Sequence, residues 1–205
     1  MASDFASVRG ETLRWLLDRE PEYRRIALLG SLFAGVLGGL GTLITAVWGH
    51  AAARPTYFLL VWIAMGGLGA FATAYLLASA AFKRGEPFVS RGFRLALDSL
   101  LPPALAAFAI LVLLTRAGIP PALIASIASI LYGNWILAAS PFAPKPLRRL
   151  GWSFLAAGLV LLGLLIVAYL GQITAVVAIP AWIWTASTFC LLHLIYPIYG
   201  RGKAG

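Results

Sequence analysis

The histidines and the single cysteine are the residues of this chain best suited to attack a substrate or bind a metal. Ser187, Cys190 and His193 follow one another at steps of three near the end of the last apolar stretch. A serine nucleophile needs its base within hydrogen-bond reach. Ser187 and His193 would instead lie about 9 Å apart along one helix, at about 1.5 Å per residue. The spacing favours a structural histidine, hydrogen-bonded to Asn134 or to a serine of another helix.

The number and positions of the histidines and the cysteine also disfavour metal and cofactor chemistry. His50 and His193 belong to opposite ends of their apolar stretches, roughly 30 Å of hydrocarbon apart, so one ion or haem could not use both. One cysteine cannot form an intrachain disulfide, a Cys-pair redox motif or a multi-Cys metal site. We therefore expect no cofactor and no metal, and we interpret Cys190 as a small packing residue.

The seven acidic residues lie outside the apolar stretches or at the edge of one. They are Asp4, Glu11, Asp18, Glu20, Glu22, Glu86 and Asp98. Ion-coupled carriers and intramembrane proteases usually carry ionisable residues inside the membrane. The sequence therefore predicts a protein that is not an enzyme, since a membrane-embedded transferase or hydrolase would have to take its acid from Glu86 or Asp98 at the surface.

The elements that hold these residues are long apolar stretches. The chain is 61% hydrophobic and 11% charged over 205 residues, with a mean hydropathy of +0.90, which is far more apolar than a soluble domain. Stretches of this length can cross about 30 Å of hydrocarbon. Six of them are expected to be membrane spans: Ile26 to Trp48, Tyr57 to Phe82, Leu100 to Thr115, Pro121 to Phe142, Phe154 to Gly171 and Ile173 to Tyr196.

Basic residues alternate between the loops of this arrangement. All Lys and Arg except Arg54 and Arg116 fall before the first stretch, after the second, after the fourth or after the sixth. Loops rich in Lys and Arg remain cytoplasmic. The sequence thus predicts an all-α bundle of six spans with both termini in the cytoplasm, and this topology explains the pI near 10.3 without nucleic-acid binding.

Two segments are expected to face lipid or a partner. Glu11 to Arg19 has the composition of an amphipathic helix lying in the headgroup plane, and the loop from Lys83 to Asp98 mixes basic and aromatic residues. Such segments attract anionic lipids of the inner leaflet. The residues predicted to face lipid or partner are Arg14, Trp15, Lys83, Arg84, Arg91 and Arg94.

Small residues predict how the helices pack, because close helix contacts in lipid depend on them. The glycines from Gly35 to Gly41 and from Gly66 to Gly69 favour close packing of the first two spans. Ser126 and Ser129 belong to a small, weakly polar stripe on the fourth span. Prolines are expected in the first turn of the third span, at Pro102 and Pro103, and at a kink in the sixth, at Pro180.

The tryptophans allow two interpretations. Trp48, Trp62, Trp182 and Trp184 lie toward one side of the membrane and Trp15 and Trp152 toward the other, as in aromatic belts. The alternative is an aromatic pocket for a hydrophobic ligand, formed by Trp135 with Trp182 or Trp184.

Four short motifs in the second half of the chain resemble a group of multi-pass bacterial inner-membrane proteins with no established activity. They are L-Y-G-N-W at 131–135, S-P-F at 140–142, P-L-R-R-L-G at 146–151 and H-L-I-Y at 193–196. The chain departs from the group in the asparagine after L-Y-G and in proline-rich sequence where a simple turn is usual. The resemblance implies a bacterial inner-membrane location and supplies no activity.

The chain is thus divided into a cytoplasmic interfacial segment at 1–25, a six-helix membrane domain at 26–199 and a cytoplasmic tail at 200–205. We interpret the protein as an accessory or regulatory subunit whose basic cytoplasmic face meets a membrane or cytoplasmic protein, or a second copy of itself. The alternative is a carrier or binding protein for a hydrophobic or uncharged small molecule. Its site would comprise Ser126, Ser129, Asn134, Trp135 and His193.

Overall fold

The computed structural model describes residues 20–48, 55–85, 91–139, 145–171 and 180–201, and this part of the chain is all-α. The helices are α2 (Glu20–Val47), α4 (Pro55–Lys83), α5 (Arg91–Arg116), α6 (Pro121–Ala139), α7 (Lys145–Leu170), α9 (Ala181–Thr185), η2 (Ala186–Cys190) and α10 (Leu191–Arg201). The last three follow one another without a break, with the π-helical turn η2 in the middle.

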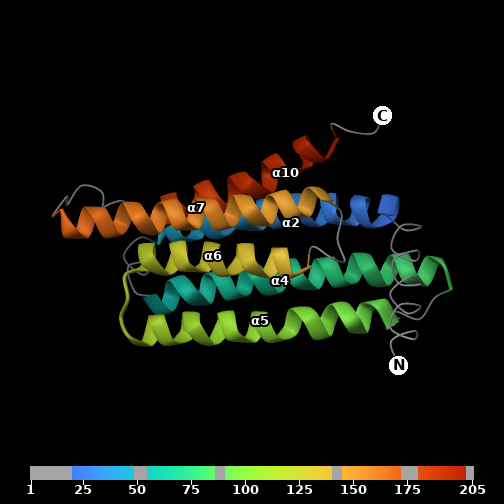
Figure 1. The fold of residues 1–205 in the computed structure, drawn as a ribbon, viewed down its shortest axis with the longest axis horizontal. Helices are drawn as coiled ribbons and strands as arrows, with labels where there is room; N and C mark the ends of the chain where they lie inside the picture. The colour runs from blue at the N-terminus through green and yellow to red at the C-terminus, as the bar shows by residue number, and fades with distance from the viewer. Residues whose placement is uncertain (1–19, 49–54, 86–90, 140–144, 172–179, 202–205) are drawn as a thin grey trace, which may run out of the picture.

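The helices form a bundle along one long axis, and successive helices run in opposite directions (Figure 1). As a result, α2, α5 and α7 begin at the end of the bundle where α4, α6 and α10 finish. The last helix packs against α2, α6 and α7, while α4 contacts α2 and α5. The C-terminal helix therefore lies at the junction of segments from both halves of the chain.

Four helical segments are long and apolar enough to cross a membrane: Arg25–Val47, Pro55–Lys83, Pro121–Ala138 and Pro146–Leu170. The described parts of the other two predicted spans contain no apolar helical stretch of this length. The apolar part of α5 is the shorter segment Leu100–Arg116, because the first turns of that helix are polar. The described part of the last span starts at Pro180 and is divided by η2.

Several predicted boundaries were wrong because polar residues extend the helices beyond their apolar cores. Helix α5 begins at Arg91, so Pro102 and Pro103 lie inside it rather than in its first turn, and Asp98 is helical rather than in a loop. Helix α7 begins at Lys145 and therefore includes arginines that were assigned to a loop. Pro180 does not kink the described helix but precedes it in an extended conformation.

The closest helix contact joins α6 and α7. A Cβ atom added at Gly133 would lie 2.7 Å from the Leu155 nitrogen and 2.8 Å from the Gly151 carbonyl oxygen. One added at Gly158 would lie 2.8 Å from the Ile130 nitrogen. Glycine at both positions therefore lets the two backbones touch, as small residues do in membrane bundles.

The glycines of α2 serve two neighbours rather than one. Gly41 does face α4, where an added Cβ would lie 3.1 Å from Met65. Gly35 and Gly38 instead face the last helix, with His193, Leu194 and the Phe189 carbonyl within 3.3 Å of an added Cβ. Gly66 and Gly67 of α4 face open space. The prediction that these glycines all pack the first two spans together was therefore wrong in part.

Candidate functional site

His193 is the centre of a buried polar site between the last helix and α6. The residue is 4% exposed. Its Nδ1 lies 2.8 Å from the Phe189 carbonyl oxygen, and its Nε2 lies 2.9 Å from the Tyr132 hydroxyl. Because a carbonyl can only accept, Nδ1 carries the proton, and Nε2 of the neutral ring accepts from Tyr132. Both ring nitrogens are thus satisfied inside the protein.

Aromatic rings enclose this pair. Phe154 is fully buried and meets the Tyr132 ring edge-on, with centroids 4.8 Å apart, and the His193 ring at 4.9 Å. The Phe189 ring lies 5.2 Å from Phe154, and Trp135 lies 5.8 Å from Tyr132. We call Tyr132, Trp135, Phe154, Phe189 and His193 the histidine cluster. Edge-on and tilted contacts of this kind stabilise aromatic pairs beyond their buried area.

Helix α2 contacts the backbone of the last helix around Phe189 and His193. The Ser31 hydroxyl donates to the His193 carbonyl at 2.9 Å. Glycines of α2 allow the approach, since any larger residue at Gly38 would press on the Phe189 carbonyl in η2. The π-helical turn directly precedes α10, and turns of this kind are frequent at functional sites. Helices α2, α6, α7 and the last helix therefore meet around one histidine.

The predicted polar stripe on α6 is buried and internally bonded. Ser129 is 0% exposed, and its hydroxyl lies 2.9 Å from the Ala125 carbonyl and 3.4 Å from the Thr188 hydroxyl. Ser126 donates to the Leu123 carbonyl at 2.9 Å. These hydroxyls bind helix to helix or to their own backbone, which is the common role of such residues in membrane bundles.

The structure gathers some of the predicted ligand-binding residues and separates others. Ser129, Trp135 and His193 surround the α6 contact with the last helix, whereas Asn134 is exposed. The Trp135 indole donates to the Leu100 carbonyl of α5 at 3.2 Å. Ser187 is exposed and hydrogen-bonded to its own helix, so it does not face His193.

The histidine's partner was missed from the sequence. Tyr132, rather than Asn134 or a serine side chain, binds the imidazole. The short motifs could have pointed to this partner, because residues of three motifs belong to one core cluster. They are Tyr132 and Trp135 of 131–135, Leu147 and Leu150 of 146–151, and Tyr196 of 193–196. Three of the four motifs that carried the resemblance thus meet at one place in the fold.

Trp135 and Trp184 do not share a pocket. Trp135 packs in the core around Ile136, whereas Trp184 packs in a separate cluster around Phe58 and Ile124. The predicted pocket of Trp135 with Trp184 was therefore wrong, because Trp135 on α6 and Trp184 on α9 pack in different clusters.

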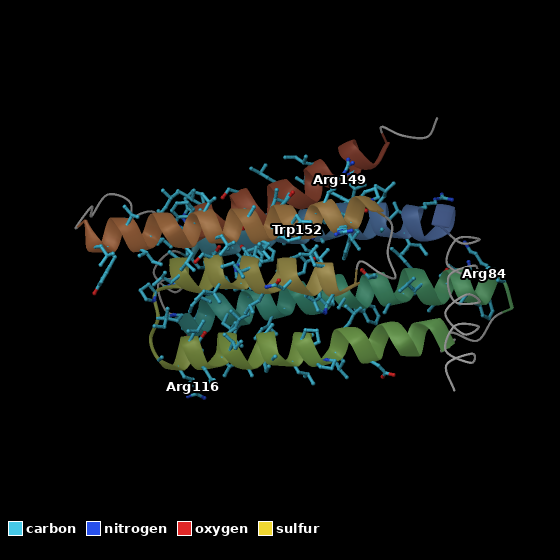
Figure 2. All side chains as sticks on the ribbon, in the orientation of Figure 1. Arg84, Arg116, Arg149 and Trp152 are labelled. Carbon is cyan, nitrogen blue, oxygen red and sulfur yellow. The ribbon has the colours of Figure 1, made fainter. Side chains whose placement is uncertain are left out.

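A second candidate site is the end of the bundle where α2, α5 and α7 begin. Figure 2 shows Arg84 and Arg149 toward this end and Arg116 at the other. The exposed basic side chains described at this end are Arg25, Lys83, Arg84, Arg148 and Arg149, and we call it the basic end. An exposed tryptophan, Trp152, follows Arg149 along α7. The exposed carboxylate of Asp98, two turns into α5, is the acidic side chain described on the same half.

The other residues predicted to face lipid or a partner are only partly described. Arg14 and Trp15 lie outside the described residues. Arg91 and Arg94 occupy the first turn of α5, and their side chains also lie outside the described part. Among the described residues, no group of three His, Cys, Asp or Glu side chains could hold a metal ion.

No protein-family model, curated protein or solved structure matches the chain. The functional argument therefore depends on the two sites themselves.

Proposed function

We propose that this chain is a non-enzymatic, multi-pass protein of a bacterial inner membrane, with six spans and both termini in the cytoplasm, and that it acts as an accessory or regulatory subunit. The observation that carries the proposal is the segregation of exposed charge. Five described basic side chains surround the basic end, and Arg116 lies at the opposite end. Positive charge is retained on the cytoplasmic side of membranes.

The interior supports a role in recognition rather than chemistry. The buried hydroxyls of Ser31, Ser126 and Ser129 all donate to backbone carbonyls, and both nitrogens of His193 are bonded. Groups engaged in this way stabilise a helix bundle and do not offer a free nucleophile. The exposed charged groups that a partner would meet are the guanidinium and ammonium groups of the basic end.

The partner of this end is expected to be acidic, either a protein surface or the anionic lipid of the inner leaflet. Each Lys or Arg near such a surface contributes about 1 kcal/mol of attraction. Trp152 lies beside the arginines of α7 and is 53% exposed, as suits a residue at the headgroup level. Lipid attraction orients the bundle, and the same charges are then presented to an acidic protein.

The test is purification of the full-length protein from its own membranes in several mild detergents. The proposal expects a protein partner in fixed stoichiometry with the chain. The double variant Arg84→Gln/Arg149→Gln should lose most of that partner, while Arg116→Gln at the opposite end should retain it. Recovery of the lone chain in every detergent would reject the subunit role.

A carrier for an uncharged small molecule is the second function, and one observation favours it. Trp135 and His193 both contact Tyr132, and the Ser129 hydroxyl lies 3.4 Å from the Thr188 hydroxyl in the turn before α10. Asn134 is exposed on another face and does not complete that site. Joint replacement of Asn134 and His193 by Leu should abolish binding of a transported ligand, and unchanged binding would dispose of this site.

A further inference from the structure

The indole N–H groups of Trp62 and Trp184 are buried donors that find no acceptor among the described residues. Trp62 belongs to α4 and Trp184 to α9, yet both rings pack against the same buried residues, Phe58, Ile124 and Ala125. We call these five residues the indole cluster. It lies toward the end of the bundle opposite the basic end, where α4 and α9 begin.

Most of the buried polar side chains that the structure describes have a hydrogen-bond partner. The neighbouring threonines illustrate the rule. Thr45 donates to the Gly41 carbonyl at 2.9 Å, Thr115 to Leu111 at 2.8 Å and Thr185 to Trp182 at 3.0 Å. Buried donors in folded proteins nearly always have a partner, and hydrocarbon supplies none. Two unsatisfied donors in one cluster therefore indicate that an acceptor belongs there.

The surroundings restrict the chemistry of that acceptor. An indole N–H can only donate, so the missing group must accept. Water fits poorly, because after accepting from the indoles it would need acceptors for its own hydrogens, and the cluster is lined by Leu111, Leu114 and Ile119. A charged ligand would place its charge in the same apolar surroundings, which is costly without a counter-charge. An uncharged carbonyl oxygen on an apolar molecule meets both conditions.

We propose that Trp62 and Trp184 donate hydrogen bonds to the carbonyl oxygens of an uncharged hydrophobic molecule, or of the ester region of a lipid, bound at the indole cluster. The Trp62 ring is held on two sides. It lies beside Gly41 of α2, and its centroid is 5.2 Å from the centroid of the Phe189 ring in η2. Both nitrogens are buried, so a ligand reaches them when a ring or α9 moves aside. This site is separate from the basic end, and it borders the histidine cluster at the contact between Trp62 and Phe189.

The experiment removes the two N–H groups without changing ring shape. In the full-length protein, Trp62 and Trp184 are both replaced by 3-benzothienylalanine, in which sulfur stands in place of the indole N–H. The matched control carries the same replacement at the exposed Trp152. Native mass spectrometry after mild extraction from the cell's own membranes reports any bound mass. We expect a bound hydrophobic molecule or phospholipid on the wild type and on the control, and at least a tenfold lower occupancy on the double variant.

A lipid ester and a free hydrophobic molecule are distinguished by reconstitution. The probes are vesicles of ester-linked phosphatidylglycerol and phosphatidylethanolamine and vesicles of the ether-linked lipids with the same headgroups. If lipid is the ligand, the wild type melts lower in ether lipids, and the double variant melts equally in both. If a free molecule is the ligand, the wild type melts equally in both, and the native extract carries a bound mass that is not a phospholipid.

Two outcomes overturn the proposal. One is equal occupancy of wild type and double variant, or no bound mass on the wild type together with equal melting in ester and ether lipids. The other is a double variant that melts higher than the wild type in every lipid, which is the result of deleting two unsatisfied donors that no ligand ever meets.

Discussion

The histidine cluster and the indole cluster are built from similar residues but differ in how their polar atoms are satisfied. Both join the last helix to α6 through aromatic rings. In the histidine cluster, Tyr132, Trp135 and His193 each have a hydrogen-bond partner within the protein. In the indole cluster, the N–H groups of Trp62 and Trp184 find no acceptor among the described residues. The two clusters therefore differ in whether these side chains find their hydrogen-bond partners within the described part of the protein.

Whether a buried polar group has a hydrogen-bond partner distinguishes a structural role from a role in binding. A fully bonded polar group in hydrocarbon fixes which helices meet and in what register. An unbonded donor raises the energy of the folded protein until something supplies an acceptor. We therefore expect the histidine cluster to stabilise the bundle, while the proposals above give the indole cluster and the basic end a role in recognition. The following changes are expected to have effects in decreasing order.

Gly133→Ala should have the largest effect, because it separates the two helices that support the histidine cluster. The added methyl group would lie 2.7 Å from the Leu155 nitrogen, and a backbone cannot rotate away as a side chain can. Overpacking of a core costs typically about 1–3 kcal/mol, and we expect the upper end of this range. Unfolding of the purified protein by SDS titration measures the loss. Gly163→Ala is the matched control, because nothing lies within 4 Å of its added Cβ.

His193→Leu should destabilise the protein by about 1–3 kcal/mol, the cost of leaving the buried Tyr132 hydroxyl without its acceptor. The double variant Tyr132→Phe/His193→Leu should recover part of this loss, since removal of both partners leaves no unsatisfied group. The same SDS titration gives the coupling free energy of the pair. Additive losses in the double variant would mean that the hydrogen bond between these residues does not contribute.

Ser31→Ala should have the smallest effect that can still be measured, about 0.6 kcal/mol, the average for a hydrogen bond between membrane helices. It removes the bond from α2 to the His193 carbonyl. Ser187→Ala is the control, because the Ser187 hydroxyl is exposed and bonds to carbonyls of its own helix. Equal melting temperatures for the two variants would argue against a role for α2 in fixing the last helix.

The helices themselves could be predicted from the sequence, because a long apolar run has few other stable structures in lipid. The predicted span from Tyr57 to Phe82 became α4 with two residues added before it and one after it. Helix ends were less predictable where charged residues continue the helix, as at the start of α7. An apolar pattern predicts which part of a helix is apolar, but it does not predict the residue at which the backbone hydrogen bonds of that helix end.

The composition of the sites could not be predicted in the same way, because it depends on contacts between helices, and residue spacing along one helix does not reveal these contacts. Ser187 and His193 are six residues apart, so at 3.6 residues per turn they point in directions about 120° apart around a regular α-helix, and here the turn from Ala186 to Cys190 is π-helical. As a result, Ser187 is exposed and His193 is buried. The partner of His193, Tyr132, comes from a different helix, and its identity required the packing of α6 against the last helix.

The most direct test of the proposed arrangement is the side of the membrane on which the basic end lies. In a Cys190→Ala background, Arg84→Cys and Arg116→Cys place single thiols at exposed positions near opposite ends of neighbouring helices. A membrane-impermeant maleimide added to intact cells should label the cysteine at position 116 and should label that at position 84 only after the membrane is opened. Labelling of position 84 in intact cells would contradict a cytoplasmic basic end, and with it the proposed subunit.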